Sequence, residues 1–416
     1  MRTGRSPARQ DALREHNLAL VLQHIAAGDP VTRARIAAAT GLTKTTVSSL
    51  VDDLVRARLV VELGPEARGE IGRPGSALTL DPSGYAGIGL EINVDYIAVC
   101  LADLTGEVRY LRTRPRDNRA QSPAKVLGRA VRMIRTAVAR AEAARLTVAG
   151  LAVAVPGPVE TDQGLLRLAP NLGWVDVPVA AILADRLAGL DLAVVVDNEA
   201  NLAALGELWF GGHHDLADFI HVSGEIGVGG GVVLSEELFR GVRGFAGEIG
   251  HVVVQPDGPR CRCGARGCLE QVAGQEAILR AAGLPDAGAD GPGQPGGSVA
   301  ELLARARAGD PGTLRAVEAA GRALGIGLSA TVNVVDPSTV VLGGLYAALE
   351  PWLRGPLLEL SERAITHRWS PVRLLASRLG PDAAVRGAAG SDSTRLTTTP
   401  AAVFRASGRH VAPTPP

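Results

Sequence analysis

The chain has few aromatic residues, few cysteines, almost no lysine and no excess of charge of either sign. These scarcities limit the kinds of core, scaffold and binding partner that the chain can have. Aromatic side chains make up 3% of the 416 residues, so Ala, Val and Leu must fill the interior. Four cysteines are too few for a disulfide scaffold of this length and fit a reducing compartment. Acidic and basic residues number 43 each, so no overall charge indicates nucleic acid or a membrane surface. Charge must therefore be analysed locally.

Targeting and membrane signals are missing as well. The N-terminus, Met1-Arg-Thr-Gly-Arg-Ser-Pro7, lacks the apolar core of a secretory signal peptide. No run of about 18 apolar residues predicts a membrane helix. We therefore expect a cytoplasmic protein with no membrane partner. A length of 416 residues leaves room for two or three domains of roughly 150 residues each.

A cluster of cysteines is the most specific local feature. Three of the four cysteines lie within eight positions, and His251 stands ten positions before the first of them. Three thiolates and one imidazole complete the tetrahedral shell of Zn²⁺ and leave no open position, which is typical of a structural site. The alternative is a disulfide or uncommitted thiols, but Cys261 and Cys263 are too close to pair easily, and Cys100 lies elsewhere. We predict structural zinc bound by His251, Cys261, Cys263 and Cys268.

The N-terminal segment has the pattern of a small DNA-binding domain. Apolar residues from Leu18 to Ile25 recur at helical spacing, and Thr32 and Thr43 are suited to cap a second and a third helix. A short turn containing glycine joins these last two helices as a helix-turn-helix, whose second helix enters the major groove. Apolar strands at 59–63 and 76–80 predict a hairpin wing.

The outer face of the third helix carries small hydroxyl side chains, which reach phosphates or base edges. Asp52 and Asp53 are expected to repel phosphate, so that only the first turns of the helix approach the bases. A protein-interaction module, or a head that no longer binds DNA, is the alternative. The predicted DNA contacts on the helix and the wing are Thr43, Lys44, Thr45, Thr46, Ser48, Ser49, Arg68 and Arg73.

Beyond residue 82 strands alternate with helices, which predicts an α/β fold. The characteristic motifs, besides the cysteine cluster, are Pro170–Trp174, Asp197–Asn201, Ser223–Gly231, Gly247–His251 and Asp336–Gly344. With these motifs the chain resembles the ROK family of repressors, open reading frames and sugar kinases, and within it the branch that includes xylose and N-acetylglucosamine repressors. The resemblance covers about residues 11–390. It implies an actin-like body of two lobes around a sugar cleft, with ATP beside the sugar in the kinases.

The predicted organisation follows from these patterns. The tail is rich in Ser, Thr, Ala and Pro, and its composition predicts disorder where the family usually continues with an apolar helix. The successive parts are a disordered arm (1–10), a winged helix-turn-helix domain (11–82), an actin-like sugar-binding domain with its zinc motif at 251–268 (83–390), and a disordered tail (391–416).

The resemblance also implies a sugar site. Its residues have donors and acceptors that can pair with neighbouring hydroxyls. Asn171 or Asn198, taken alone, is equally explained as a turn residue. His251 can serve zinc through one ring nitrogen and the sugar, or a supporting group, through the other. The implied sugar contacts are Asn171, Asn198, Glu199, Glu248, His251 and Glu270.

The kinase motifs are altered. The first phosphate loop of family kinases has two glycines and a hydroxyl, and here Asn93 and Asp95 stand within the matching stretch. Glu225 replaces a threonine of the second phosphate loop, and Glu199 replaces the catalytic aspartate. Acidic groups repel the phosphates that phosphoryl transfer must position. We therefore expect no catalytic residue, no bound ATP and no enzyme activity.

Taken together, the sequence predicts a sugar-responsive transcriptional regulator, a repressor of carbohydrate-utilisation genes. Its expected partners are operator DNA, a small sugar effector and a second copy of the chain, as a homodimer or a dimer of dimers. Two alternatives stay open. One is an active sugar kinase with an accessory DNA-binding head, and the other is a regulator that answers to a protein partner and has a vestigial cleft.

Overall fold

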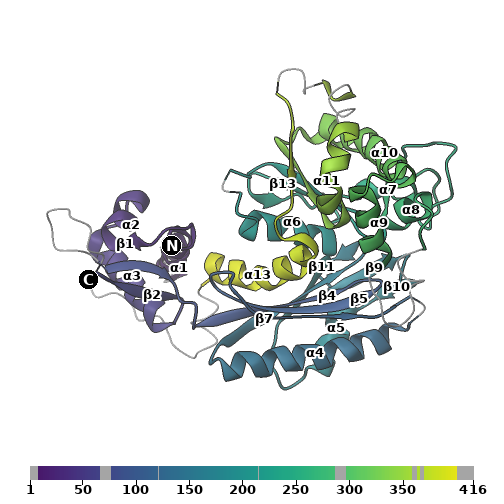
Figure 1. Cartoon of the computed structure of the whole chain (residues 1–416). Helices are drawn as coiled ribbons and strands as arrows, with labels where there is room; N and C mark the ends of the chain where they lie inside the picture. Colours follow the sequence, from purple (N-terminus) through teal and green to yellow (C-terminus); the bar gives the residue numbers. More distant parts are fainter. Residues whose placement is uncertain are drawn as a thin grey trace, which may run out of the picture.

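A small N-terminal head and a larger body of two lobes make up the molecule (Figure 1). Within the part that the structure describes, none of the helices combines the length and apolar character that a bilayer crossing requires. The computed structural model describes residues 8–65, 76–119, 121–213, 215–285, 297–357, 363–365 and 370–400.

The head contains three helices and a small antiparallel sheet. Its elements are α1 (Ala8–Ala26), β1 (Val31–Thr32), α2 (Arg33–Thr40), α3 (Lys44–Arg56), β2 (Val60–Pro65) and β3 (Ser76–Leu80). The Thr32 hydroxyl accepts from the Arg35 amide at 3.4 Å, and the Thr43 hydroxyl accepts from the Thr46 amide at 3.1 Å. Both predicted helix caps are therefore confirmed. The apolar stripe that begins at Leu18 is buried in the core of the head.

One prediction about the head is wrong, and another concerns residues outside the described part. Helix α1 begins at Ala8, so the predicted disordered arm 1–10 is wrong for residues 8–10. Ala, Arg and Gln are strong helix formers, and they extend the helix ahead of its buried stripe. The predicted wing contacts Arg68 and Arg73 lie outside the described residues.

The first lobe is built on a five-stranded sheet. In spatial order its strands are β11 (Val194–Asn198), β7 (Thr147–Val155), β4 (Tyr85–Ile92), β5 (Tyr96–Asp103) and β6 (Val108–Pro115). Strands β4 to β6 form an antiparallel meander, whereas β7 and β11 run parallel to β4. The predicted turn at 93–95 joins β4 to β5. Beside this sheet lies a small one of β8 (Val159–Glu160), β9 (Leu165–Ala169) and β10 (Trp174–Val177).

The two faces of the first sheet carry different packing. Odd-numbered residues of β5, such as Ile97 and Val99, join the core that includes α4 (Pro123–Ala143) and α5 (Val179–Arg186). Even-numbered residues of β5, such as Ala98 and Cys100, pack with residues of α13 (Ala383–Thr398). The period of two along the strand therefore separates a face of large aliphatic residues from a face of small ones.

The second lobe repeats the sheet-and-helix scheme. Its five strands in spatial order are β14 (Glu237–Leu238), β13 (Val228–Leu234), β12 (Phe219–Gly224), β15 (Thr339–Gly343) and β16 (Arg373–Ala376). The accompanying helices are α6 (Glu199–Phe210), α7 (Glu270–Ala273), α8 (Gln275–Ala281), α9 (Gly297–Arg307), α10 (Pro311–Val335) and α11 (Gly344–Leu357), with short 3-10 turns at Ile249–His251 and Gly380–Asp382. Two sheets flanked by helices agree with the predicted α/β body of two lobes.

Helix α13 corrects the prediction for the C-terminus. The disordered tail was expected from residue 391, but the helix continues to Thr398 and buries Asp392, Ser393 and Leu396. The residues of α13 that meet α6 include Ala383 and Gly387, whose small size lets the two helices approach very closely. A Cβ atom at Gly387 would lie 1.8 Å from the Leu202 carbonyl oxygen of α6. Small residues rather than large apolar ones hold this helix, so its hydrophobic pattern is weak. Residues 401–416 lie outside the described part.

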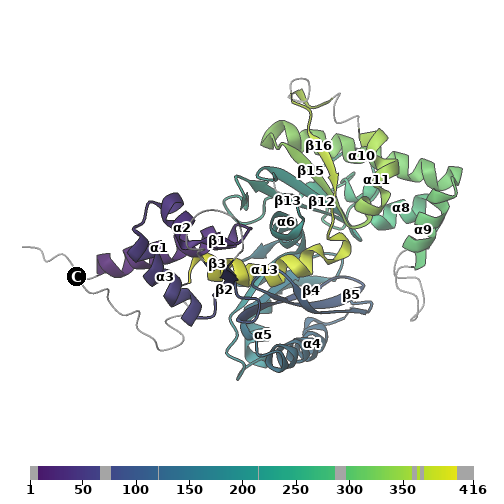
Figure 2. The same ribbon diagram turned by 60° about the vertical axis from the view of Figure 1, so that its left-hand side comes forward.

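The head and the body share a core. Leu396 of α13 and Leu104, which follows β5, pack in the same cluster as the head residues Leu18 and Leu59. Arg58 of the head also donates to the Ser83 carbonyl at the junction. Figure 2 shows α13 running from the body to the head. The head is therefore seated on the end of α13 and is not merely tethered by the chain between β3 and β4.

Candidate functional site

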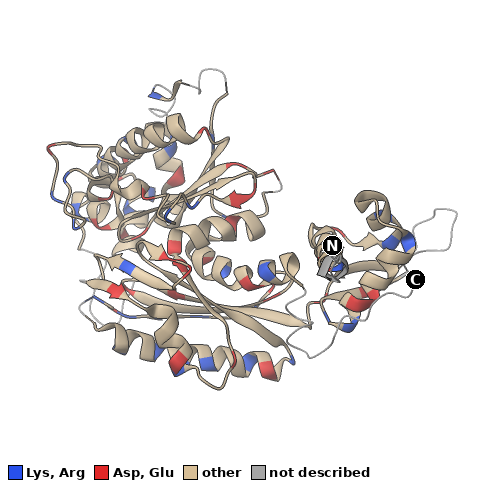
Figure 3. Cartoon of the chain, turned by 180° about the vertical axis from the view of Figure 1, so that it is seen from behind, with Lys and Arg blue, Asp and Glu red and all other residues tan. Residues whose placement is uncertain are grey.

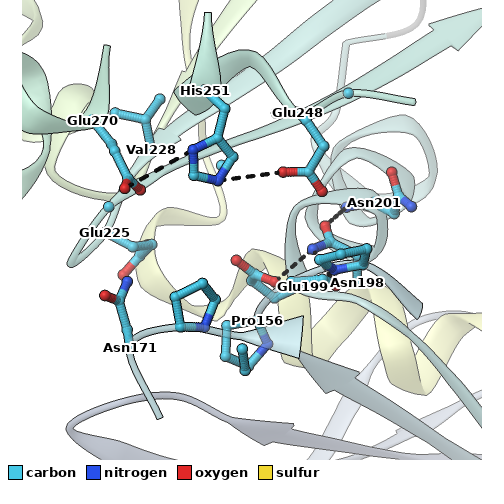
Figure 4. Close-up of a pocket in the computed structure, with 18 of the residues that line it drawn as sticks. Pro156, Asn171, Asn198, Glu199, Asn201, Glu225, Val228, Glu248, His251 and Glu270 are labelled. Carbon is cyan, nitrogen blue, oxygen red and sulfur yellow. Dashed lines mark hydrogen bonds and ion pairs between the residues drawn. The ribbon is translucent and has the colours of Figure 1, made fainter. Parts of the chain in front are cut away.

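A pocket lies where the two lobes face each other, and it brings together all six residues of the predicted sugar site (Figure 4). Asn171 comes from the first lobe, and Asn198 and Glu199 stand where β11 passes into α6. Glu248 and His251 come from the loop after β14, and Glu270 begins α7. Residues separated by almost a hundred positions thus converge on one cavity, as a site for a small polar ligand requires.

Asn198 uses its side chain to form the start of α6. Its Oδ1 accepts from the amides of Ala200 and Asn201 at 2.8 and 3.2 Å. Its Nδ2 donates to the Gly157 carbonyl at 3.1 Å and to Glu199 Oε2 at 2.9 Å. An amide side chain with both ends occupied has little capacity left for a sugar hydroxyl. In this geometry Asn198 positions Glu199.

Glu199 is the carboxyl group at the first turn of α6, and Figure 4 shows it beside Asn198. Burial raises the pKa of Glu199 to about 8, and the charges of Glu248 and Glu91 add to the effect. The group is therefore mostly protonated at neutral pH. A protonated carboxyl group is both a donor and an acceptor, which suits it to bind a hydroxyl group.

The predicted metal ligands form one compact group. The ligand atoms of His251, Cys261, Cys263 and Cys268 all lie within 4.8 Å of one another. Cys263 Sγ and Cys268 Sγ are 3.7 Å apart, and Cys261 Sγ is 3.8 Å from His251 Nδ1. Zn–S bonds of about 2.3 Å in a tetrahedron place two sulfur atoms roughly 3.8 Å apart, so this donor set fits zinc.

His251 stands between this cysteine group and the pocket. Its Nδ1 faces Cys261, while its Nε2 lies 3.7 Å from Glu248 Oε2 in the pocket (Figure 4). Glu270 Oε1 lies 2.9 Å from Cys261 Sγ. The loop that carries the cysteines therefore contacts two of the predicted sugar ligands directly.

Acidic residues crowd the region that was predicted to match the kinase phosphate loops. Tyr96 donates to Glu91 Oε1 at 2.5 Å, and Asn93 donates to the Tyr96 hydroxyl at 3.2 Å. Burial raises the pKa of Glu91 to about 7. Burial also raises the pKa of Glu225 well above its usual range, and the charges of Glu91 and Asp95 contribute. These shifts arise because several carboxyl groups share one poorly solvated space.

On the head, the predicted recognition helix presents Lys44 and Thr45 as exposed residues at its start. The expectation that both aspartates repel phosphate is wrong for Asp53, which is buried and paired with Arg14 and Arg56. Asp52 is exposed, and Arg33 binds it at 3.0 Å. Pairing lowers the repulsion that these carboxylates exert on DNA.

Comparison with known proteins identifies the body. The model of the ROK family matches residues 87–391. The chain belongs to the ROK family. A second family model, that of the MarR family, matches residues 19–69 in the head.

Three similar proteins are described as two regulators and one kinase. A putative xylose repressor of Caldicellulosiruptor sp. (strain Rt8B.4) is 32% identical over 386 residues, which cover 90% of this chain and 94% of the relative. The crystal structure of a ROK family transcriptional regulator, a homologue of the E. coli MLC protein, has a TM-score of 0.75 and 25% identity, covering 94% of this chain and 99% of that one. The crystal structure of a ROK family glucokinase from Streptomyces griseus, in complex with glucose and AMPPNP, has a TM-score of 0.61 and 30% identity, covering 73% and 98%.

Two arginines at the site of this ROK protein were missed from the sequence. Arg262, between two of the cysteines, donates to Asn171 Oδ1 at 2.8 Å, and Arg240 binds Asp197 at 2.7 Å. The first contact joins the cysteine loop to the opposite lobe. No motif indicated either partner, because each contact depends on the path of a loop. A basic residue between two predicted metal ligands is the one signal that was available for Arg262.

Proposed function

We propose that this chain is a sugar-responsive DNA-binding repressor of carbohydrate-utilisation genes. The proposal rests on one observation: a single chain combines a MarR-type head with a ROK body. The pocket of that body contains all six predicted sugar ligands. Similarity to xylose repressors over nine-tenths of the chain supports an aldose such as xylose as the effector. Operator DNA would contact the exposed start of α3 and the wing. Two copies of the chain would present two heads to two half-sites.

Zinc is the second part of the proposal. Its ligands would be His251 Nδ1 and the thiolates of Cys261, Cys263 and Cys268, whose separations suit a tetrahedral ion. When bound, the ion supplies structural cross-linking of the loop. This loop holds His251 Nε2 toward the pocket and places Arg262 against Asn171. Metal binding would thus shape the sugar site from behind.

We further propose that the sugar is bound by a mixture of donors and acceptors. Glu248 and His251 would bind one side of the ring, and Glu270 and Asn171 the other. Glu199, protonated because of its burial, would donate to a hydroxyl. Asn198 would act by holding Glu199. A pocket of this kind rejects an analogue that lacks a hydroxyl, because buried polar groups are then left unpaired.

The contact of α6 with α13 supplies a route from the sugar to the head. Helix α6 begins at the pocket with Glu199, and α13 lies against it and ends in the head core with Leu396. Because their backbones are in close contact at Gly206 and Gly387, we expect the two helices to move as one body. A sugar that shifts the start of α6 would therefore tilt the head. The free energy by which sugar changes DNA binding is set by the difference in sugar-binding free energy between the two arrangements of the head.

Kinase activity is the second candidate, and the similarity to the glucokinase with AMPPNP favours it. Against it stand Glu225 and Glu91, two buried carboxyl groups in the region predicted to match the phosphate loops. A phosphate brought there would face carboxyl groups, where kinases use backbone amides and a metal ion. We therefore favour a protein that binds sugar without phosphorylating it.

One experiment tests the proposal. The full chain is titrated onto fluorescent DNA from its own upstream region, and anisotropy is followed as xylose, glucose, other pentoses and hexoses, and N-acetylhexosamines are added. Release by one sugar, abolished in Glu248→Gln, is the expected result. Sugar-dependent ATP consumption that is lost in Glu199→Ala would instead establish the kinase. DNA binding that no sugar alters, together with no saturable sugar binding by calorimetry, would point to a protein partner and contradict the proposal.

A further inference from the structure

A groove lined by arginines runs along the outer edge of the first lobe, away from the sugar pocket. One wall is the edge strand β6 and the other is helix α4. Its central residues, which we call the arginine groove, are Tyr110, Arg112, Arg114, Arg116, Arg129 and Arg132. Over the ribbon as a whole, acidic and basic residues are interspersed (Figure 3), so this is a local concentration of one charge.

The two walls face each other through the periods of a strand and a helix. Tyr110, Arg112 and Arg114 are alternate residues of β6, so their side chains lie on one face of the sheet. They pair with residues of β5 whose side chains lie on the same face, namely Leu101, Val99 and Ile97. That face is the one covered by α4. On α4, Arg129 and Arg132 continue at helical spacing to Thr136 and to Arg140, whose guanidinium lies 5.8 Å from the Tyr110 ring centre. Both walls are roughly 17 Å long at the usual rise per residue.

The charges of this groove have no internal counterpart. Among the described residues, no carboxylate forms an ion pair with Arg112, Arg114, Arg116 or Arg129. Arg129 Nη1 is buried and has no hydrogen-bond partner. Burial lowers the pKa of Arg129, and the positive charges of Arg116 and Arg132 lower it further. Like charges held this close destabilise the fold unless something else neutralises them.

Protection of the sheet edge explains only part of this arrangement. Charged side chains on an edge strand prevent pairing with other strands, and this accounts for arginines on β6. It does not account for arginines on α4 that face them across a groove, nor for the buried Nη1 of Arg129, which has no hydrogen-bond partner. We propose that the arginine groove binds a small anion that carries two or more phosphate groups.

The chemistry of guanidinium favours phosphate. Each planar guanidinium donates two parallel hydrogen bonds to a phosphate, and a phosphate group brings up to two negative charges. Two or three phosphates would thus neutralise most of the groove. A carboxylate brings one charge, so an acidic peptide would need a longer contact. The proposal is independent of the sugar pocket and of the head.

Calorimetric titration of the full chain in phosphate-free buffer tests the inference. The probes are tripolyphosphate, fructose 1,6-bisphosphate and inorganic phosphate. We expect the first two to bind at least tenfold tighter than inorganic phosphate, with an affinity that falls as salt rises. Tighter binding of tripolyphosphate would assign the groove to inorganic polyphosphate, and tighter binding of the bisphosphate would assign it to a phosphorylated metabolite.

The variant Arg114→Glu/Arg129→Glu should lose at least tenfold in affinity. Arg112→Glu/Arg114→Glu, both exposed on β6, replaces it if the first variant does not fold. Both variants keep the edge charged, so edge protection alone predicts no change in binding. The matched control is Arg307→Glu/Arg315→Glu, which reverses two exposed charges of the second lobe.

Three results would overturn the inference. One is no binding of either multiply charged probe. Another is equal affinity in the groove variant and the wild type. The third is equally tight binding of poly-glutamate, which would show that the groove responds to charge and not to phosphate. Loss of non-specific DNA affinity in the groove variant, without any binding of the small probes, would assign the groove to DNA instead.

Discussion

Replacing one glycine of α13 with alanine should separate two helices, α6 and α13, that pack closely together. At Gly387 a Cβ atom would lie 1.8 Å from the Leu202 carbonyl oxygen and 2.8 Å from the Gly206 amide nitrogen, whereas ordinary contact begins at 3.4 Å. Both obstacles are backbone atoms of α6, so no side chain can turn away. Helix α13 must therefore move outward by more than an ångström, and it carries the head with it.

The magnitude follows from two opposing effects. Alanine favours a helix over glycine by about 1 kcal/mol, whereas overpacking costs about 1–3 kcal/mol or more when backbones collide. We expect Gly387→Ala to lower the free energy of unfolding by about 2 kcal/mol. Gly355→Ala in α11 is the matched control, because no heavy atom lies within 4 Å of its Cβ position. In that variant the gain of about 0.5–1 kcal/mol from helix propensity is opposed by the steric restriction that Pro356 places on the residue before it, so we expect little net change in stability.

Urea denaturation followed by circular dichroism measures both variants. Operator anisotropy then shows whether sugar still releases DNA from Gly387→Ala, which we expect to bind sugar normally but to release DNA less. If Gly387→Ala were as stable as Gly355→Ala, the close packing of α6 on α13 would be refuted. A stable variant with an unchanged sugar response would refute the route from α6 to the head.

Three other predictions follow from the same structure. With zinc bound as proposed, its removal, or Cys263→Ser, should lower the melting temperature and abolish the sugar response, because metal-binding energy is partly folding energy. A metal-free preparation that melts unchanged would contradict this. Burial raises the pKa of Asp392 to about 7, above the usual unfolded value of about 3.9, so its contribution to stability is present at low pH and is lost as the pH rises through 7. At pH 8 the free energy of unfolding of Asp392→Asn should therefore exceed that of the wild type by up to about 4 kcal/mol, and this difference should vanish near pH 4. Unfolding free energies that run parallel with pH in the two proteins would refute the raised pKa of Asp392. Lys44→Ala should weaken operator binding and reduce the salt slope by about one, and an unchanged slope would remove Lys44 from the interface.

Much of the molecule was predictable from local sequence. The caps Thr32 and Thr43, the turn at 93–95 and the cysteine cluster depend on neighbouring residues, and the structure has each where it was expected. The pocket also gathers the six residues that the family resemblance implied. These features share short sequence spacing or a specific motif.

The parts that failed depend on contacts distant in sequence. Helix α13 was missed because alanine, glycine and serine give little hydrophobic signal, although they permit the closest approach to α6. Asp53 was expected to face DNA, but Arg14, 39 positions earlier, holds it inside the head. The partner of Arg262 could not be predicted, since it depends on how the cysteine loop crosses to Asn171. Periodicity finds elements, but it does not identify their distant partners.

Because Leu396 of α13 packs in the core of the head, the head cannot be exchanged between proteins as an N-terminal segment alone. The head is continuous in sequence only as far as β3, yet its core is completed by a residue more than three hundred positions later. A fragment that ends after the wing would expose an apolar surface where α13 belongs. An exchange of heads between two sensors of this kind would therefore succeed only when the last turns of α13 are exchanged with the head. The transferable module is made of both ends of the chain.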